Sequence, residues 1–302
     1  MKTLRSLALL TLLSVLALAQ SSDILPGDNL VIDGIPSIPA TIAATTNRYT
    51  EYRTATIQDW HPTERSMLIT TRFADTNQVH RVDFPGGARS QLTFFPDRVL
   101  TAFYQPTKGD YFLFLKDVGG GEWYQIYRYD FSTNDSTLLT DGKSRNLDVR
   151  WNHAGDRIAY SSTRRNGKDT DIWVMNPRDP KSDHMLVQLE GGGWVVTGWS
   201  FDDKQFALME DVSINESYVW VVNASTGEKT LITPKGRPDK IAYAGAEFSK
   251  DGKGLYATTD KDSEFRRLTY IDLATKQHTY LTSHINWDVD DFELSEDGKT
   301  LA

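Results

Sequence analysis

The 302-residue chain contains no cysteine, which excludes disulfides and zinc sites built on thiolates. Positive charge is also in short supply: 33 Lys and Arg face 41 Asp and Glu, a formal net charge of −8. This acidity argues against nucleic acid or an anionic membrane surface as a partner. No segment after the N-terminus has a convincing 3.6-residue apolar period, so we expect almost no helix there.

Motifs of catalysis and metal binding are also missing. The chain has no Gly-x-Ser-x-Gly, and none of its six histidines stands in a metal-ligand spacing with another histidine. Gly142-Lys143-Ser144 lacks the strand-loop-helix setting of a phosphate loop. Acidic pairs such as Asp169 and Asp171 lack calcium-loop spacing and are interpreted as solvated turns. We therefore predict no catalytic residue, no metal and no cofactor in this chain.

Residues 1–19 have the composition of a signal peptide. Lys2 and Arg5 precede an apolar run at Leu7–Leu18, which is too short to span a bilayer, and Ala17-Leu18-Ala19 is a small-residue cleavage site. Removing the two positive charges takes the net charge from −8 to −10. We expect an exported protein, periplasmic or extracellular, with no membrane attachment after cleavage.

A pattern of an aromatic residue, a polar turn and a short alternating strand recurs along the chain, as in WNHAGDRIAYSSTR at residues 151–164. The steps between the opening aromatics are 44, 47, 48, 49 and 44 residues. A period in the forties with several short strands per unit is typical of β-propeller blades. The opening aromatics are Trp60, Tyr104, Trp151, Trp199, Phe248 and Phe292.

The second half of each repeat is a strand, a polar turn and a strand ending in Leu-Thr or its equivalent, as in residues 124–140. Period-2 alternation on both sides of such turns indicates a hairpin. Two hairpins per repeat predict four-stranded blades. The predicted fold class is therefore all-β, a propeller over residues 57–302 with about five complete blades and a partial sixth.

The two ends of the predicted propeller depart from the repeat. Residues 20–56, rich in Pro, Gly and Thr, predict an extended lead-in with little regular structure. Its segment 38–42 either pairs with the last blade and closes the ring or belongs to a loose arm. The last repeat stops at Ala302 within its first hairpin, where an open ring exposes strand edges. We expect the chain to be part of a longer protein.

Two stretches depart from the repeat, Gly119–Asp130 and Gly142–Trp151. They lie on connections between predicted strands, and loops on one face of a propeller are a usual place for binding residues. The alternative is that these are solvated charged loops with Trp123 in the core between blades. The candidate substrate-binding residues are Glu122, Trp123, Arg145 and Asn146.

From Tyr49 to its end, the chain resembles the N-terminal propeller of the prolyl oligopeptidase family of serine peptidases, in its exported bacterial dipeptidyl-aminopeptidase-like and acylaminoacyl-peptidase-like members. The segments that carry the resemblance are DWHPTERSMLITTRFADTNQVHRV, GGARSQLTFF, GGGEWYQIYRYD, LTDGKSRN and AYSSTRRNGKDTDIW, followed by GGGW, WS and NES.

The resemblance implies a C-terminal α/β-hydrolase domain that holds Ser, Asp and His and carries out acyl transfer. The propeller would cap that site and admit only short peptides. Members that trim dipeptides hold the substrate's free amine with acidic propeller residues, for which Glu122 is the candidate here. No part of the triad can be placed on this sequence, so the chain alone is expected to be inactive.

Two other interpretations remain open. One is a TolB-type periplasmic propeller that acts as a protein-interaction module without chemistry. The other is a propeller lyase or glycosidase, which would need two acids converging at the central channel. Oligomerisation is possible under each of them.

Overall fold

The computed structural model describes residues 23–25, 27, 29–236, 238–295 and 297–302. The predicted signal peptide at residues 1–19 lies outside this part. The chain divides into two compact units, Met1–Thr54 and Ala55–Ala302. Within the described residues, no helix has the length and apolar character that a membrane crossing requires.

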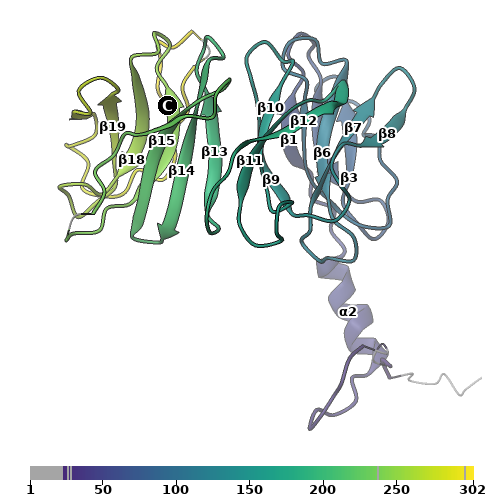
Figure 1. The fold of residues 1–302 in the computed structure, drawn as a ribbon. Coiled ribbons are helices and arrows are strands. Elements are labelled where there is room, and N and C mark those ends of the chain that lie inside the picture. The colour runs from purple at the N-terminus through teal and green to yellow at the C-terminus, as the bar shows by residue number, and fades with distance from the viewer. Residues whose placement is uncertain (1–22, 26, 28, 237, 296) are drawn as a thin grey trace, which may run out of the picture. The chain divides into compact units, whose positions relative to one another are not determined.

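The larger unit consists of five four-stranded antiparallel sheets, which are the blades of a β-propeller (Figure 1). Blade 1 contains β1 (Thr56–Trp60), β2 (Met67–Thr71), β3 (Gln78–Val82) and β4 (Ser90–Gln91). Blade 2 contains β5 (Val99–Tyr104), β6 (Tyr111–Lys116), β7 (Gln125–Asp130) and β8 (Asp135–Leu138). Blade 3 contains β9 (Asn146–Trp151), β10 (Ile158–Ser162), β11 (Asp171–Asn176) and β12 (Asp179–Val187). Blade 4 contains β13 (Trp194–Trp199), β14 (Gln205–Ser213), β15 (Glu216–Asn223) and β16 (Lys229–Leu231). Blade 5 contains β17 (Tyr243–Phe248), β18 (Gly254–Thr259), β19 (Arg267–Asp272) and β20 (His278–Tyr280).

The predicted repeat and the observed blades coincide. In each blade the opening aromatic is the last residue of the first strand, and the polar turn leads into the second strand. Strands adjacent in sequence are adjacent in the sheet, so every blade is a meander of local hairpins. The prediction of an all-β propeller with four-stranded blades is confirmed.

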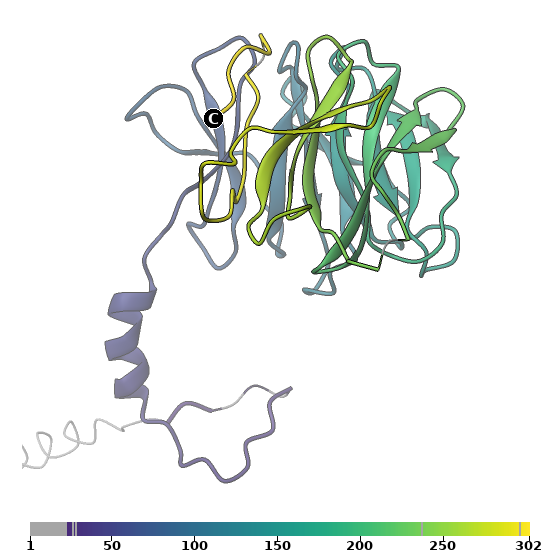
Figure 2. The same ribbon diagram turned by 90° about the vertical axis from the view of Figure 1, so that its left-hand side faces the viewer.

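A short hairpin follows blade 5 and begins the partial sixth unit. Leu294 forms a β-bridge with Leu301, and Glu293 and Ala302 exchange two backbone hydrogen bonds of 3.0 Å. Phe292 is buried and lies against Gly245, where a Cβ atom would come within 2.9 Å of the phenyl ring. Figure 2 shows this yellow C-terminal segment beside the fifth blade.

The Leu-Thr ending of the repeats has a structural role. The threonine hydroxyl accepts a hydrogen bond from a backbone N–H on the third strand of its own blade, at 2.9 to 3.1 Å. This satisfies a buried donor where the fourth strand has ended. The four pairs are Val79 with Thr93, Ile126 with Thr140, Val219 with Thr233, and Leu268 with Thr282.

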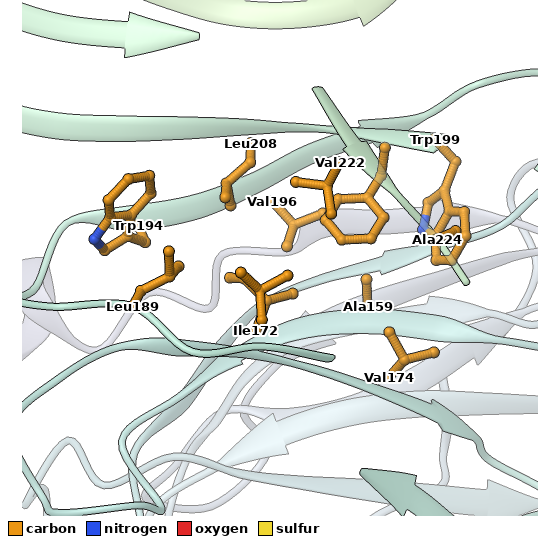
Figure 3. Packing of buried hydrophobic residues seen from close by; sticks show 12 residues of the cluster. Ala159, Ile172, Val174, Leu189, Trp194, Val196, Trp199, Leu208, Val222 and Ala224 are labelled. Atoms are coloured by element: carbon orange, nitrogen blue, oxygen red, sulfur yellow. The ribbon is translucent and has the colours of Figure 1, made fainter. Parts of the chain in front are cut away.

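The hydrophobic core lies between blades. Four buried clusters correspond to the four boundaries between consecutive blades. In the cluster between blades 3 and 4, Ile172 and Val174 of β11 meet Val196 of β13 and Leu208 of β14 (Figure 3). The alternating residues of each strand therefore bury both faces of every inner blade.

The lead-in differs from the prediction. Residues Ala40–Thr50 form a helix, α2 (Figure 1), so the expectation of an extended segment is wrong there. None of the helical residues is buried. A helix that buries no face needs no apolar stripe, so the sequence lacked the pattern by which a helix is predicted. The segment at residues 38–42 enters this helix, and the backbone N–H of Ile24 donates to the carbonyl of Ile38 at 2.8 Å within the same unit.

Candidate functional site

A cavity of about 540 Å³ lies at one edge of blades 2, 3 and 4. Because neighbouring strands alternate in direction, the connections that follow even-numbered strands all emerge at the same edge of the propeller. Four of these connections meet here: β6 to β7, β8 to β9, β10 to β11, and β12 to β13. The cavity is thus built from loops that lie far apart in the sequence.

Three of the four predicted binding residues line this cavity. Glu122 and Trp123 come from the β6–β7 loop, and Arg145 comes from the loop before β9. The nearest Glu122 Oε2 and Arg145 Nη2 atoms lie 4.0 Å apart. The Trp123 side chain is 48% exposed, so it is not part of the core between blades.

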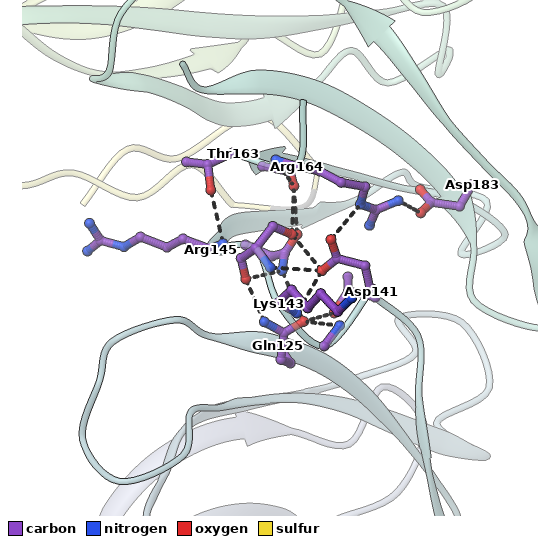
Figure 4. Close-up of polar contacts among 12 residues, drawn as sticks. Gln125, Asp141, Lys143, Arg145, Thr163, Arg164 and Asp183 are labelled. Carbon is purple, nitrogen blue, oxygen red and sulfur yellow. Dashed lines mark hydrogen bonds and ion pairs between the residues drawn. The ribbon is translucent and has the colours of Figure 1, made fainter. Parts of the chain in front are cut away.

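Local hydrogen bonds orient these residues. Glu122 has a φ of +60° and donates its backbone N–H to Asp117 Oδ2 at 2.8 Å, which fixes the turn that presents its carboxylate. The backbone N–H of Arg145 donates to Thr163 Oγ1 at 3.1 Å. The β8–β9 and β10–β11 loops are thereby joined beside the cavity (Figure 4).

Asn146, the fourth predicted residue, lies elsewhere. It is the first residue of β9 and is fully buried. Its Nδ2 donates to the carbonyls of Tyr124 and Ser144 at 3.0 Å, and its Oδ1 accepts from Ser162 Oγ at 2.8 Å. Asn146 therefore supports the loops and does not reach the cavity.

A network of hydrogen bonds joins the β8–β9 loop to Gln125 at the start of β7 (Figure 4). Gln125 Nε2 donates to the Ser144 carbonyl, and its Oε1 accepts from the Gly142 N–H at 2.9 Å. Burial alone would raise the pKa of Asp141, but hydrogen bonds from Ser144 and Lys143 keep that pKa below its ordinary value. The ionised carboxylate thus ties down the loop that carries Arg145.

The sequence reasoning missed Asp148, which lines the same cavity. Asp148 lies in a β-bulge of β9 with a φ of +55°, a rare conformation for a residue with a side chain. Its Oδ2 accepts from Ser161 Oγ at 2.6 Å. Burial raises the pKa of Asp148, with Ser161 and nearby arginines opposing the rise. The first strand of each blade has a bulge, but the sequence does not show which bulge carries an acid.

The β10–β11 loop contributes Lys168, also missed, and is held in place by charged contacts. Arg165 pairs with Asp169 at 3.0 Å and with Asp171 at 2.8 Å. Asp171 is fully buried at the start of β11, so the interpretation of this acidic pair as a solvated turn is wrong for Asp171. Asp169 Oδ1 also accepts the N–H of Gly191 at 2.9 Å. This bond fixes the loop before β13, in which the next residues, Gly192 and Gly193, line the cavity. The role of Asp169 and Asp171 is therefore structural.

The cavity combines opposite charges with aromatic surface. Glu122 and Asp148 provide negative groups, and Arg145 and Lys168 provide positive ones. Trp123 adds an indole at the same surface. Among the described lining residues there is no histidine or cysteine, so no nucleophile is paired there with a histidine base. The arrangement is suited to binding a small ligand that carries both charges.

Comparisons with known proteins identify the fold. No known family profile matches the chain, and no curated protein matches it. A prolyl endopeptidase structure is 13% identical with a TM-score of 0.63, over 80% of this chain and 38% of that one. An oligogalacturonate lyase in complex with manganese is 14% identical with a TM-score of 0.58, over 76% of this chain and 66% of that one. A TolB structure from Agrobacterium tumefaciens is 17% identical with a TM-score of 0.50, over 76% of this chain and 80% of that one.

These proteins have different activities, and their identities to this chain are low. The similarity therefore shows the β-propeller fold alone. The chain spans about two thirds of the lyase and little more than a third of the prolyl endopeptidase. Within the described residues no group of three or more His, Cys, Asp or Glu is placed to hold a metal ion.

Proposed function

We propose that the chain is the non-catalytic propeller of an exported serine peptidase and that its 540 Å³ cavity binds the charged end of a short peptide. The observation that carries the proposal is the convergence of Glu122, Asp148, Arg145 and Lys168 around one cavity. A short peptide has a free amine and a carboxylate close together. Two acids and two bases match such a ligand in sign.

The proposed role of the propeller is to restrict access and to position the substrate. Its likeness to a prolyl endopeptidase, of which it matches 38%, supports this role. The Ser, His and Asp of such an enzyme would come from an α/β-hydrolase domain that this sequence does not include. The propeller would exclude folded proteins and contribute Glu122 and Asp148 as partners for the peptide amine.

The balance of charge in the cavity disfavours a polyanionic substrate such as an oligogalacturonate. Binding a chain of carboxylates requires an excess of positive groups, and this cavity pairs its two bases with two acids.

The test of the peptidase assignment is an intact-mass measurement on the mature protein from its native source after reaction with a fluorophosphonate. We expect a covalently labelled species much larger than the 34.1 kDa of this chain. An unlabelled species of 34.1 kDa or less would contradict the assignment.

The test of the cavity is calorimetric titration of this chain with the dipeptides Gly-Ala and N-acetyl-Gly-Ala. We expect Gly-Ala to bind and the blocked peptide to bind at least about tenfold more weakly, since a hydrogen bond to a charged group is worth about 1.5–3 kcal/mol. Glu122→Gln should weaken Gly-Ala to a similar degree. Glu228→Gln, an exposed change on the opposite edge in the β15–β16 turn, is the control and should leave binding unchanged.

A TolB-type interaction module is the second candidate, because the likeness covers 80% of the TolB chain from Agrobacterium tumefaciens. This candidate predicts an unlabelled mature protein and no dipeptide binding. It also predicts that a partner protein co-purifies with the propeller from its native source.

A further inference from the structure

The boundary between blades 2 and 3 differs from the other boundaries at its innermost strands. Elsewhere, the first strands of neighbouring blades are joined by hydrogen bonds that involve side chains. Among the described residues, no such bond joins β5 to β9. The bonds at the other boundaries link Ala102 to Gln58, Tyr104 to Asp59, Trp199 to Arg150, Arg150 to Thr197, and Thr197 to Ala246.

Trp151 and Trp199 differ in their hydrogen bonding, although they occupy the same position in successive repeats. Trp199 Nε1 donates to the carbonyl of Arg150 across the boundary at 3.0 Å. Trp151 Nε1 is buried and has no hydrogen-bond partner. A buried N–H without an acceptor is rare and costly, and no residue of β5 supplies the bond that Arg150 supplies to Trp199.

A second cavity, of about 390 Å³, occupies this boundary. Its walls are largely apolar, with Leu100 and Phe103 of β5, Leu115 of β6 and Trp151 of β9. Leu147 and Asp148 line both this cavity and the larger one. The charged cavity and the apolar cavity are therefore neighbours that share Leu147 and Asp148 in their linings.

We propose that the apolar cavity between β5 and β9 receives the first side chain of a bound peptide, so that the site selects peptides beginning with a large apolar residue. The inference rests on the proposed function, which places the peptide amine at Glu122 and Asp148. In a peptide the free amine and the first side chain are attached to the same carbon. Asp148 lines both cavities, so it can bind the amine while the side chain enters the apolar cavity.

The volume and lining of the cavity support this occupant. A cavity of about 390 Å³ is large enough for an aromatic or branched side chain. Burying such a side chain against Leu100, Phe103 and Trp151 would contribute hydrophobic free energy that glycine cannot provide. The polar lining residues are Thr101, Asp148 and Arg150, so a polar first residue would lose water on entering and find partners only at these positions.

The test is calorimetric titration of this chain with Phe-Ala and Gly-Ala. We expect Phe-Ala to bind at least about tenfold more tightly than Gly-Ala, because apolar pockets discriminate by about tenfold or more per side-chain difference of this kind. Leu100→Trp should fill the cavity and reduce the affinity for Phe-Ala to that for Gly-Ala. Leu100 is 38% exposed, so the strand has room for the change.

The control is Leu138→Trp, a matched substitution of a 41% exposed leucine on the outer strand β8 of the same blade. It should keep the preference for Phe-Ala. If both dipeptides bind wild-type protein equally, the specificity pocket is wrong while the proposed peptide site stands. If neither dipeptide binds, both the inference and the peptide site fail. Retention of the preference in Leu100→Trp would also overturn the inference.

Discussion

The boundary between blades 2 and 3 and the boundary between blades 3 and 4 are built from the same repeat but bonded differently. Each is packed by a hydrophobic cluster. At the boundary of blades 3 and 4, the innermost strands are linked through Arg150, Thr197 and Trp199. At the boundary of blades 2 and 3, β5 and β9 leave a cavity and Trp151 lacks an acceptor.

The turns reinforce the difference. Asp203 of blade 4 accepts the backbone N–H groups of His153 and Ala154 and the amide of Asn152, at 2.8 to 3.1 Å. The corresponding turn contact between blades 2 and 3 is a single neutral bond of 2.9 Å from Gln105 to the Gly155 carbonyl. Apolar packing therefore repeats from blade to blade, while hydrogen bonding between the innermost strands does not. The candidate site adjoins the boundary at which, among the described residues, no side-chain hydrogen bond joins the innermost strands.

The largest effect is expected from Asp203→Ala, which removes the charged acceptor at the boundary of blades 3 and 4. Several donors would lose their partner, so we expect the free energy of unfolding to fall by about 2–4 kcal/mol in urea titrations. Asp203→Asn should cost less, because asparagine tolerates the φ of +56° and keeps one acceptor oxygen. A loss below about 0.5 kcal/mol for Asp203→Ala would show that this clamp is not a source of stability.

The sharpest test of the comparison pairs Trp199→Phe with Trp151→Phe. Both changes remove similar apolar volume, but only Trp199 loses a hydrogen bond across the boundary. We expect Trp199→Phe to be more destabilising by about 1–3 kcal/mol. Trp199→Phe leaves the carbonyl of Arg150 without this donor, whereas Trp151→Phe removes an N–H that has no acceptor. Thermal and urea unfolding would measure both. Equal losses would mean that the two indoles are in equivalent environments.

A smaller effect is expected from Asp148→Asn, and it should depend on pH. Burial raises the pKa of Asp148 in the folded protein above its unfolded value, so the wild-type carboxyl favours folding at low pH. That contribution is lost as the pH rises through the folded-state pKa. Asparagine does not ionise, so the Asp148→Asn variant does not lose stability in this way. Its free energy of unfolding relative to that of the wild type should therefore increase as the pH rises from about 4. Urea titrations across that range measure it, and a difference independent of pH would contradict the raised pKa.

The smallest effect on stability is expected from Glu122→Gln and Arg145→Gln. The two charges are 4.0 Å apart, and their side chains are 65% and 48% exposed. Exposed ion pairs contribute little, so each change should alter the free energy of unfolding by less than about 0.5 kcal/mol. A clear loss of stability in either variant would indicate that the pair is structural and would weaken its assignment to binding.

Much of the fold could be predicted because propeller blades are built from local hairpins. The aromatic at the end of each first strand, the polar turn and the closing Leu-Thr are all close in sequence, so their period exposes the blades. The helix Ala40–Thr50 escaped prediction because none of its residues is buried and no apolar stripe was needed.

The site was only partly predictable. The segments of Glu122, Trp123 and Arg145 depart from the repeat, which singled them out, and the direction of the strands brings their loops to one cavity. Asn146 lies outside this cavity, because the chain enters β9 at that residue and buries its side chain, which its position next to Arg145 in the sequence does not reveal. Asp148 gave no signal, since a bulge in a strand changes where a side chain points without changing the pattern of residues.

The sequence by itself determined that the blades are four-stranded and in which order their strands pair, because strand pairing between neighbours needs only local turns and alternation. Only the tertiary structure decided which boundary between blades is bonded at its inner strands. Trp151 and Trp199 are the same residue at the same repeat position, yet one indole meets a carbonyl and the other does not. A hydrogen bond forms only within a few tenths of an ångström of its ideal length, and the packing of whole blades sets that distance.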